Sequence, residues 1–328
     1  MSTGREESDL LQRLAQGPVS GETLAQALGL TRAAVWKRIQ ALRDAGVAID
    51  AHAHRGYALA QPLDLLDANA IRAALPVAQC ARLQLEIAWS IDSTNSELLR
   101  RSAPAQGSVA LLAERQTAGR GRRGRSWASP LAAHLYLSLA RGFQGGLARL
   151  AGLSLVAGVV VCEVLHASGF TAVRLKWPND LVVVDGSGLR KLGGLLVEGG
   201  GEAAGQCRAV IGLGLNVRMP PAFAVLIDQP WIDLAGMMSV PPSRSALAGS
   251  LLAALLPALE EFEDAGLAPF LPRYAMLDAL AGRQIEIRDG SRQWSAHALG
   301  VADDGALRVR AEDGQERRVH AGDVSVRA

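Results

Sequence analysis

Arginines alternate with glycines in the stretch ERQTAGRGRRGRSW, residues 114–127. The planar guanidinium group binds carboxylate and phosphate with two parallel hydrogen bonds, and glycine lets backbone N–H groups approach an oxyanion closely. No GK[ST] sequence follows, so the stretch is not a Walker A loop. A nucleic-acid-binding RG segment is the alternative, but such segments are longer and do not lead into an apolar run such as HLYLSLA. We interpret the stretch as a lid over a small anionic ligand, disordered until that ligand binds.

KWPND, residues 176–180, interrupts a strand-like pattern and brings a cation, an amide and a carboxylate together. Its proline lacks a backbone donor, so Lys176, Asn179 and Asp180 are expected where a strand meets a loop. Lys191 begins a second strand-like run, KLGGLLVE, and is a candidate for stabilising negative charge. The alternatives are a β-bulge with an Asx turn for KWPND and a solvated lysine at position 191.

Two further stretches suit an uncharged or flat ligand. In GLGLNV, Gly212 and Gly214 alternate with aliphatic residues and leave one strand face without side chains, on which a flat ligand could lie. This lone GxG is not a dinucleotide-binding fingerprint. IDSTN, residues 91–95, offers hydroxyl and amide groups to a polar head group, or else caps a helix that begins near SELLR. The tryptophans beside these polar stretches are candidate ligand platforms: Trp89, Trp127 and Trp177.

Before the strands that must position these residues, the start of the chain shows a helix-turn-helix pattern. Ser20 and Thr31 are placed as N-caps of two helices, and Gly46 ends the second helix. VAIDAHAHRGYALA then has the shape of a wing. We expect DNA contacts from basic residues that lie outside the apolar stripe of the second helix, namely Arg32, Lys37 and Arg38. An ordinary solvated basic face is the alternative.

The remainder of the chain indicates a mixed α/β domain followed by a small β-barrel. The apolar stretch 147–169 predicts a buried core helix rather than a membrane span. A second helix is expected over 243–266, with Pro257 as a kink or a break. After residue 277 short strands are separated by Asp-Gly turns, which is typical of a barrel. The predicted domains are therefore 1–62, 63–277 and 278–328.

Composition narrows the class of protein. The chain has 328 residues, 49% of them hydrophobic, which is enough for more than one domain. With 34 Lys and Arg against 32 Asp and Glu, the formal charge of +2 produces no chain-wide field for nucleic acid or lipid. An acidic, polar start predicts a cytoplasmic protein that does not bind a membrane. The histidines and cysteines show no spacing of metal ligands.

Taken in order behind a winged helix-turn-helix and before a small barrel, IDSTN, QTAGRGRRGRSW, KWPND, KLGGLLVE and GLGLNV resemble the bacterial biotin protein ligase family. More narrowly, the chain is similar to the bifunctional members that also repress biotin-synthesis genes. The resemblance covers nearly the whole chain. It implies an α+β fold with a winged helix-turn-helix, a class II synthetase-like catalytic domain and an SH3-like β-barrel.

The resemblance also implies a two-step acyl transfer. Biotin and ATP with Mg²⁺ give biotinyl-5'-AMP, and a lysine of the biotin carboxyl carrier protein of acetyl-CoA carboxylase then takes the biotinyl group. A positive lid would hold two mutually repelling anions together and keep water from the mixed anhydride. By resemblance, the catalytic residues would be Lys191, Arg122 and Asp180.

The candidate binding residues are drawn from all five stretches. By resemblance Ser93, Thr94 and Gln116 would bind the biotin head group, Arg120, Gly121 and Arg122 would bracket the carboxylate and phosphate, Asn216 would help bind phosphate and magnesium, and Trp127 would close over the nucleotide. The full set is Ser93, Thr94, Asn95, Gln116, Gly119, Arg120, Gly121, Arg122, Trp127, Lys176, Asn179, Lys191, Gly212, Gly214 and Asn216.

Partners and rival functions follow from the same resemblance. The expected partners are the carrier protein, biotin operator DNA and a second copy of the chain in a ligand-promoted homodimer. One rival is a lipoate or octanoate protein ligase, against which KWPND and the terminal barrel argue. Another is a ligand-sensing transcription factor without transferase activity, against which Lys191, Asp180 and Arg122 argue.

Overall fold

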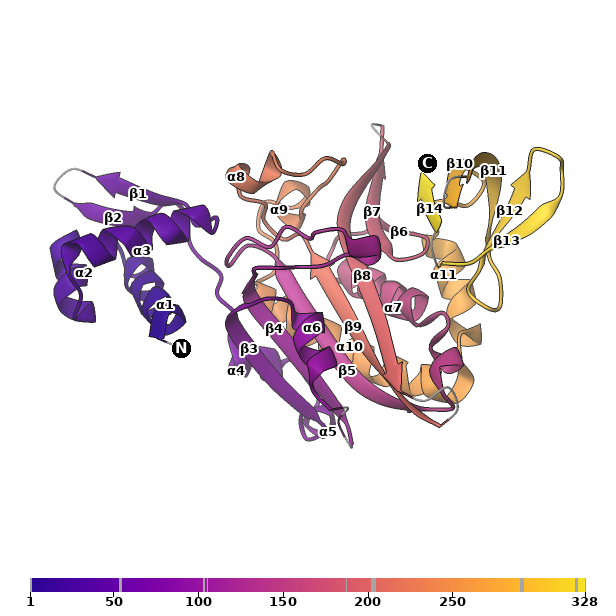
Figure 1. The fold of residues 1–328 in the computed structure, drawn as a ribbon, viewed down its shortest axis with the longest axis horizontal. Coiled ribbons are helices and arrows are strands. Elements are labelled where there is room, and N and C mark those ends of the chain that lie inside the picture. Colours follow the sequence, from indigo (N-terminus) through magenta and orange to yellow (C-terminus); the bar gives the residue numbers. More distant parts are fainter. Residues whose placement is uncertain are drawn as a thin grey trace.

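The computed structural model describes residues 2–52, 55–102, 104, 106–186, 188–201, 205–289, 292–321 and 324–327. Figure 1 shows three units in a row: a helical unit with a two-stranded sheet, a central unit built on a large sheet, and a small β unit at the opposite end. The predicted α+β class is confirmed. The boundaries 62/63 and 277/278 fall between elements, and we retain them as proposed domain limits.

The N-terminal unit is a helix-turn-helix with a two-stranded wing. Its elements are α1 (Ser2–Ala15), α2 (Gly21–Leu28), α3 (Arg32–Asp44), β1 (Ile49–His52) and β2 (Gly56–Leu59). The predicted N-caps are confirmed, because the side chains of Ser20 and Thr31 accept hydrogen bonds from backbone N–H groups three residues ahead. Gly46 follows α3 with a φ of 104°, in the region that favours glycine.

The helix-turn-helix unit packs against the edge of the central sheet. Leu131, just beyond the Arg/Gly stretch, belongs to the hydrophobic core of the N-terminal unit, and its N–H donates to the Ala45 carbonyl at 2.8 Å. The indole N–H of Trp89 donates to a carboxylate oxygen of Glu7 in α1 at 2.9 Å. Trp89 therefore supports the contact between the two units, whereas its sequence neighbours had suggested a ligand platform.

The central unit contains a seven-stranded sheet in the order β3-β4-β5-β9-β8-β7-β6. Its strands are β3 (Leu83–Ile91), β4 (Ser108–Gln116), β5 (Leu135–Gln144), β6 (Val173–Lys176), β7 (Asp180–Asp185), β8 (Gly188–Gly201) and β9 (Gln206–Leu215). β3 and β4 are parallel, and the other neighbours pair antiparallel. Short 3-10 turns occur at η1 (Arg122–Gly124), η2 (Leu147–Leu150) and η3 (Ala268–Phe270).

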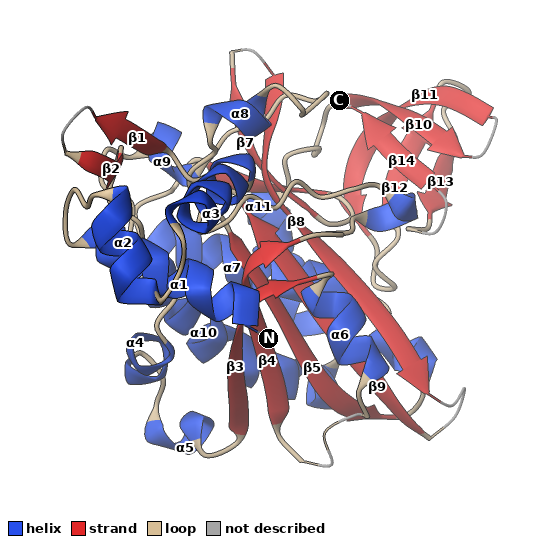
Figure 2. Ribbon diagram, turned by 60° about the vertical axis from the view of Figure 1, so that its left-hand side comes forward, coloured by secondary structure: helices blue, strands red, loops and turns tan. Residues whose placement is uncertain are grey.

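Helices cover both faces of this sheet (Figure 2). α6 (Thr94–Arg100) lies on one face, and α7 (Leu153–Ala167) and α10 (Arg244–Ala265) lie on the other. The other helices of this unit are α4 (Ala68–Ala73), α5 (Val77–Cys80), α8 (Pro221–Ala224), α9 (Leu234–Met237) and α11 (Leu271–Leu277). Ala110 and Leu112 of β4 pack in the large core with α7 and α10, whereas Leu111 packs with Leu98 of α6. This alternation is the period of two that places successive strand residues on opposite faces.

The helix α7 and the longer α10 are core helices. Each lies in a stretch long and apolar enough to cross a membrane, yet 61% of each apolar window is buried inside the protein. The predicted burial of the first is confirmed. α10 continues through Pro257 as one helix, so the predicted break does not occur. At its start, Arg244 is buried and pairs at 2.6 Å with Glu114, the first residue of the Arg/Gly stretch.

The C-terminal unit is a five-stranded antiparallel sheet in the predicted place. Its strands are β10 (Gln284–Asp289), β11 (Arg292–Val301), β12 (Leu307–Ala311), β13 (Glu316–Val319) and β14 (Val324–Arg327), in the order β13-β12-β11-β10-β14. Gly305 and Gly314, each preceded by Asp, have φ of 83° and 79° and make the predicted turns. The buried Trp177 donates its indole N–H to the Gly305 carbonyl at 3.0 Å, which joins KWPND to this unit.

Candidate active site

A cavity of about 430 Å³ lies where the Arg/Gly stretch, KWPND and the ends of β8 and β9 converge. Residues from five separate stretches of sequence line it, which agrees with their predicted convergence. The candidates that line it are Ser93, Thr94, Asn95, Gln116, Arg120, Gly121, Arg122, Trp127, Lys176, Asn179, Asp180, Lys191, Gly212 and Gly214. Gly119 and Asn216 lie outside the lining.

The start of α6 forms the uncharged end of the cavity. The buried Ser93 caps α6, as one interpretation of IDSTN predicts, and it also lines the cavity, where contact with a polar head group stays a prediction. The backbone N–H of Thr94 donates to Oε1 of Gln116 at 2.9 Å, and Nε2 of Gln116 donates to the Ser129 hydroxyl at 3.2 Å. Internal partners thus fix the Gln116 amide, and this end can recognise a polar group without charge.

The glycine face of β9 is covered by protein side chains, which corrects the expectation of a bare platform. A Cβ at Gly212 would lie 2.3 Å from Oδ1 of Asn95, and one at Gly214 would lie 2.6 Å from the Trp127 ring. No side chain other than hydrogen fits at these positions. A flat ligand would therefore meet Asn95 and Trp127 rather than the strand itself.

The Arg/Gly stretch is a tight turn stabilised by its own backbone. The Gly121 N–H donates to the Arg125 carbonyl at 2.7 Å, and the Trp127 N–H donates to the Gly119 carbonyl at 2.8 Å. A Cβ at Gly119 would lie 2.7 Å from the Ser129 hydroxyl, so this glycine serves packing at the base of the turn. The structure describes every residue of the stretch, and its disorder without ligand stays a prediction.

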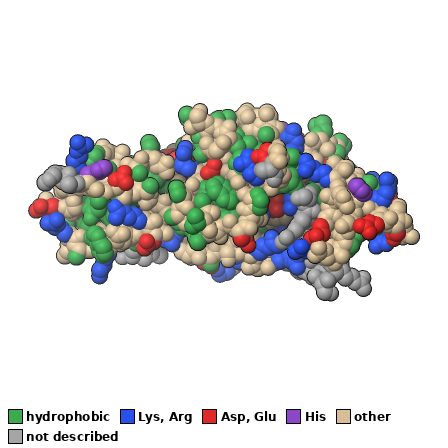
Figure 3. Space-filling model, turned by 90° about the horizontal axis from the view of Figure 1, so that it is seen from above, with side chains coloured by type: hydrophobic (Ala, Val, Ile, Leu, Met, Phe, Trp, Pro, Cys, Tyr) green, Lys and Arg blue, Asp and Glu red, His purple; other side chains and the backbone are tan. Residues whose placement is uncertain are grey.

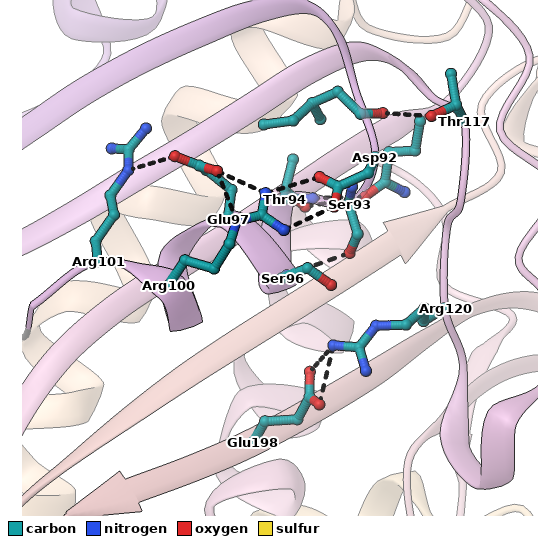
Figure 4. A network of polar contacts seen from close by, with 12 residues as sticks. Asp92, Ser93, Thr94, Ser96, Glu97, Arg100, Arg101, Thr117, Arg120 and Glu198 are labelled. Carbon is teal, nitrogen blue, oxygen red and sulfur yellow. Dashed lines mark hydrogen bonds and ion pairs between the residues drawn. The ribbon is translucent and has the colours of Figure 1, made fainter.

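Two arginines of this turn hold internal partners. Nη2 of Arg120 donates to both carboxylate oxygens of Glu198, at 3.0 and 2.9 Å (Figure 4). Nη1 of Arg122 donates to Oδ1 of Asn179 at 3.2 Å, and its Nη2 donates to the Ala321 carbonyl of the C-terminal unit. An anionic ligand would therefore have to replace these partners, because both guanidinium groups are already hydrogen-bonded within the protein.

The charged residues of KWPND and β8 meet in the cavity close to Arg122. Nζ of Lys191 lies 2.7 Å from Oδ1 of Asp180 and 5.5 Å from the centre of the Trp127 ring. Both members of the ion pair are about four-fifths buried, with 19% and 24% of their side chains exposed. Two of the three predicted catalytic residues thus contact each other directly.

Burial lowers the pKa of the Arg122 guanidinium from its usual value, and the neighbouring charges of Arg123 and Arg125 lower it further, while Asp180 opposes them. Arg122, Arg123 and Arg125 thus bring three cations to the lid end of the cavity. A carboxylate or phosphate placed among these groups would relieve their repulsion.

Asn216 supports the β8 backbone instead of lining the cavity. Its Nδ2 donates to the Ile232 carbonyl at 3.1 Å and to the Lys191 carbonyl at 3.4 Å, and its side chain is buried. Among the described residues, no group of three His, Cys, Asp or Glu could hold a metal ion. The carboxylates that line the cavity, Asp180 and Asp228, therefore do not build a dedicated magnesium site.

Three parts of the site escaped the sequence analysis. Ser138 lines the cavity from an otherwise apolar strand, and the lone hydroxyl in LYLSLA was the available signal. Glu198 lies at the end of KLGGLLVE, where only its partner Arg120 reveals its role. Residues 228–230 also line the cavity, and their sequence, DQP, carries no signal beyond that of a turn.

The basic residues predicted to contact DNA lie on α3 and are not equivalent. Arg32 and Lys37 are exposed, whereas Arg38 is partly buried in an ion pair with Glu6 of α1. Trp36 stands beside Lys37 with 55% of its surface exposed. Across the face seen in Figure 3, blue and red side chains are interspersed, in keeping with the nearly balanced charge.

Three segments match known family models. Residues 87–216 match the Biotin/lipoate A/B protein ligase family, residues 6–58 match an HTH domain, and residues 281–327 match the Biotin protein ligase C terminal domain. The chain is also 41% identical over 320 residues to the Bifunctional ligase/repressor BirA of Salmonella typhimurium, with 97% of both chains covered. The chain belongs to the biotin protein ligase family.

Further relatives agree with this membership. The Bifunctional ligase/repressor BirA of Escherichia coli is 40% identical over 320 residues, covering 97% of this chain and 96% of that one. The structure of a biotin protein ligase from Aquifex aeolicus in complex with biotin and ATP has a TM-score of 0.61 and 24% identity, and covers 74% of this chain and 98% of that one. This last likeness shows a shared fold.

Proposed function

We propose that the protein is a biotin protein ligase that also represses biotin-synthesis genes in response to biotin. The observation that carries the enzymatic part is one cavity with an uncharged hydrogen-bonding end, at Thr94 and Gln116, and a cationic end, at Arg120, Arg122 and Lys191. Biotin has a polar uncharged ring system and a carboxylate, and this division of the cavity matches both.

In the first step, a biotin carboxylate oxygen attacks the α-phosphorus of ATP, the bond to pyrophosphate breaks, and biotinyl-5'-AMP forms. Arg120, Gly121 and Arg122 bracket the carboxylate and phosphate, while Lys191 binds the oxygens on which negative charge increases. Such preorganised cations contribute about 3 kcal/mol or more to a transition state of this kind. The turn above the cavity limits access of water to the mixed anhydride.

In the second step, a lysine amine of the biotin carboxyl carrier protein attacks the carbonyl carbon, and the bond to AMP breaks. The amine must lose a proton, and Asp180, which lines the cavity, orients the amine or helps to remove that proton. In the structure Asp180 forms an ion pair with Lys191. When Lys191 turns to the substrate anions, Asp180 becomes available to the incoming amine.

The remaining candidates serve the nucleotide. We assign Trp127, Lys176, Asn179 and Gly214 to its binding because they line the same cavity as Lys191, and Gly212 adjoins Asn95 and contributes through it. Mg²⁺ would arrive with the ATP phosphates and reduce their charge, and the two cavity carboxylates suit a supplementary contact only. No step is assigned to the metal. Asn216 would act by holding the Lys191 backbone.

The repressor part of the proposal rests on the helix-turn-helix unit. We propose that Arg32, Lys37 and Arg38 of α3 contact biotin operator DNA, and that biotinyl-5'-AMP promotes a homodimer that binds two half-sites. The protein would act in the cytoplasm, where carrier protein and DNA are both present. Sedimentation velocity with and without the adenylate tests the dimer, and an unchanged sedimentation coefficient contradicts it.

ATP–pyrophosphate exchange tests the enzymatic part. We expect exchange with biotin, little with lipoate or octanoate, and loss of exchange in Lys191→Ala. Exchange with lipoate or octanoate instead of biotin would move the protein to the lipoate ligases. Biotin binding without exchange would favour the ligand-sensing transcription factor.

A further inference from the structure

An exposed tryptophan lies on the second helix of the helix-turn-helix. Of the six tryptophans in the chain, all of which the structure describes, only Trp36 is exposed. It leaves 55% of its surface open to solvent, whereas Trp177 of KWPND leaves 1%. A single exposed apolar side chain is common on protein surfaces, so the surroundings of Trp36 decide whether it has a function.

Trp36 lies in the half of α3 that is remote from the catalytic unit. The helix ends at that unit, where the Ala45 carbonyl accepts from the Leu131 N–H at 2.8 Å. Nearer the start of the helix, Ala33 and Lys37 are exposed together with Trp36. In a helix-turn-helix protein the N-terminal residues of the second helix contact base edges in the major groove. Trp36 is therefore on the part of α3 that would enter the groove.

The charge of α3 favours DNA as the partner of this surface. The helix carries four cations: Arg32, Lys37, Arg38 and Arg43. Within α3 the one carboxylate is Asp44, the last residue, so the surface around Trp36 is positive. A second copy of the chain, packed symmetrically on this surface, would bring the same cations opposite one another. A phosphate backbone would instead attract them.

The chemistry of Trp36 indicates which base it would meet. The apolar group that a base pair presents in the major groove is the thymine methyl group, and an apolar side chain is its complement. Ala33, three residues before Trp36, is small and exposed, which leaves room for the edge of a base. Gln40 lies one turn after Trp36, and its amide can bind N6 and N7 of adenine. An A·T pair offers both groups.

We propose that Trp36 is a specificity-determining residue that packs against a thymine methyl group in the major groove, and so selects an A·T pair in each half-site. The inference rests on the proposed DNA binding and deepens it, because it names a base that the operator must contain. Lys37, the next residue, binds phosphate and carries no sequence information. Trp36 thus contributes to specificity, and Lys37 contributes to affinity.

The test begins with random DNA duplexes, from which the full-length protein, with biotin and ATP, selects its binding sequence. Each thymine of that sequence is then replaced in turn by deoxyuridine, which lacks only the methyl group, and fluorescence anisotropy measures the affinity. At one thymine we expect the unmodified protein to bind about fourfold more weakly, as for the loss of one buried methyl group. Trp36→Ala should bind the thymine duplex about tenfold more weakly and should not distinguish the two duplexes.

Lys37→Ala is the matched control, because it changes the neighbouring exposed residue of the same helix. It should weaken binding of both duplexes by the same factor and so keep the fourfold difference. Retained ATP–pyrophosphate exchange shows that Trp36→Ala is folded, and Trp36→Gln, which also removes the apolar ring, provides a second variant.

Two results would overturn the inference alone: no thymine at which deoxyuridine weakens binding, or the same loss in the Trp36 variants as in the unmodified protein. If Trp36→Ala selects the same sequence but no longer forms the adenylate-dependent dimer, Trp36 covers a second copy of the chain, and the inference is wrong. A selection that yields no binding sequence would instead overturn the proposed DNA binding, and this inference with it.

Discussion

At the uncharged end of the cavity the polar side chains hold one another, whereas at the lid end the charged side chains hold partners that a ligand can replace. Thr94, Asn95 and Ser138 are buried and form their hydrogen bonds inside the protein. Arg120 and Lys191 pair with the carboxylates of Glu198 and Asp180. The first end is preorganised, and the second must exchange partners when anions arrive.

The largest effect should come from removing a cation at the exchanging end. Arg122→Ala should reduce ATP–pyrophosphate exchange about 100-fold, or about 2.7 kcal/mol, because Arg122 is partly buried and lines the cavity among the groups that meet the phosphate. Arg123→Ala, an exposed neighbour, is the control and should lose less than about threefold. Equal losses in the two variants would mean that the lid acts by total charge alone.

At the preorganised end the effect should be smaller and confined to one substrate. Thr94→Val keeps the shape of the side chain and removes the hydroxyl, so the KM for biotin should rise about tenfold to thirtyfold. The KM for ATP should stay within about twofold, because Thr94 lies at the uncharged end. Steady-state exchange with each substrate varied in turn measures both. A parallel rise in both constants would show that the two ends are not separable.

His134 is a buried histidine whose protonation should make the stability of the protein depend on pH. Burial, with a contribution from the nearby Arg244, lowers the pKa of His134 from 6.5 to about 3, and its Nδ1 accepts from the Val217 N–H at 3.2 Å. The folded protein therefore holds this ring neutral, while the unfolded chain takes up a proton below pH 6.5. The contribution of His134 to stability should be complete above that pH and fall by about 1.4 kcal/mol per pH unit as the pH drops toward 3.

Urea unfolding of His134→Asn between pH 7.5 and 4.5 measures this term, since the asparagine amide oxygen can replace the Nδ1 acceptor without titrating. The variant should show a shallower loss of stability with acid than the unmodified protein. Parallel curves for the two proteins would show that His134 does not contribute to the acid sensitivity.

The smallest effect concerns the cations of α3. Arg38 already has a protein partner, whereas Lys37 is exposed to solvent. Lys37 is exposed and should meet a DNA phosphate, so Lys37→Ala should reduce the slope of log affinity against log salt by about 1. Arg38 is already paired with Glu6, and Arg38→Ala should change the slope less. Fluorescence anisotropy with operator DNA at several salt concentrations measures both. A larger change for Arg38 would show that DNA displaces Glu6.

Local sequence patterns were sufficient to predict features that depend on neighbouring residues of the same element. The helix caps at Ser20 and Thr31, the Asp-Gly turns at Gly305 and Gly314 and the burial of α7 were predicted and are present, while Gly290 lies outside the described residues. Each depends on neighbours within about four residues, or on periodicity along one element. The expectation of a bare face at Gly212 and Gly214 was wrong because the side chains that cover it come from distant segments.

The sequence by itself determined which chemical groups this protein has and in what order: the arginine turn, KWPND, Lys191 and the hydroxyls of IDSTN. Only the tertiary structure decided their partners. Glu198 is 78 positions from Arg120 and 103 from Asn95, yet it contacts both. The reason is physical, since strand pairing and helix packing bring remote side chains within hydrogen-bonding distance, while spacing along the chain records only local contacts.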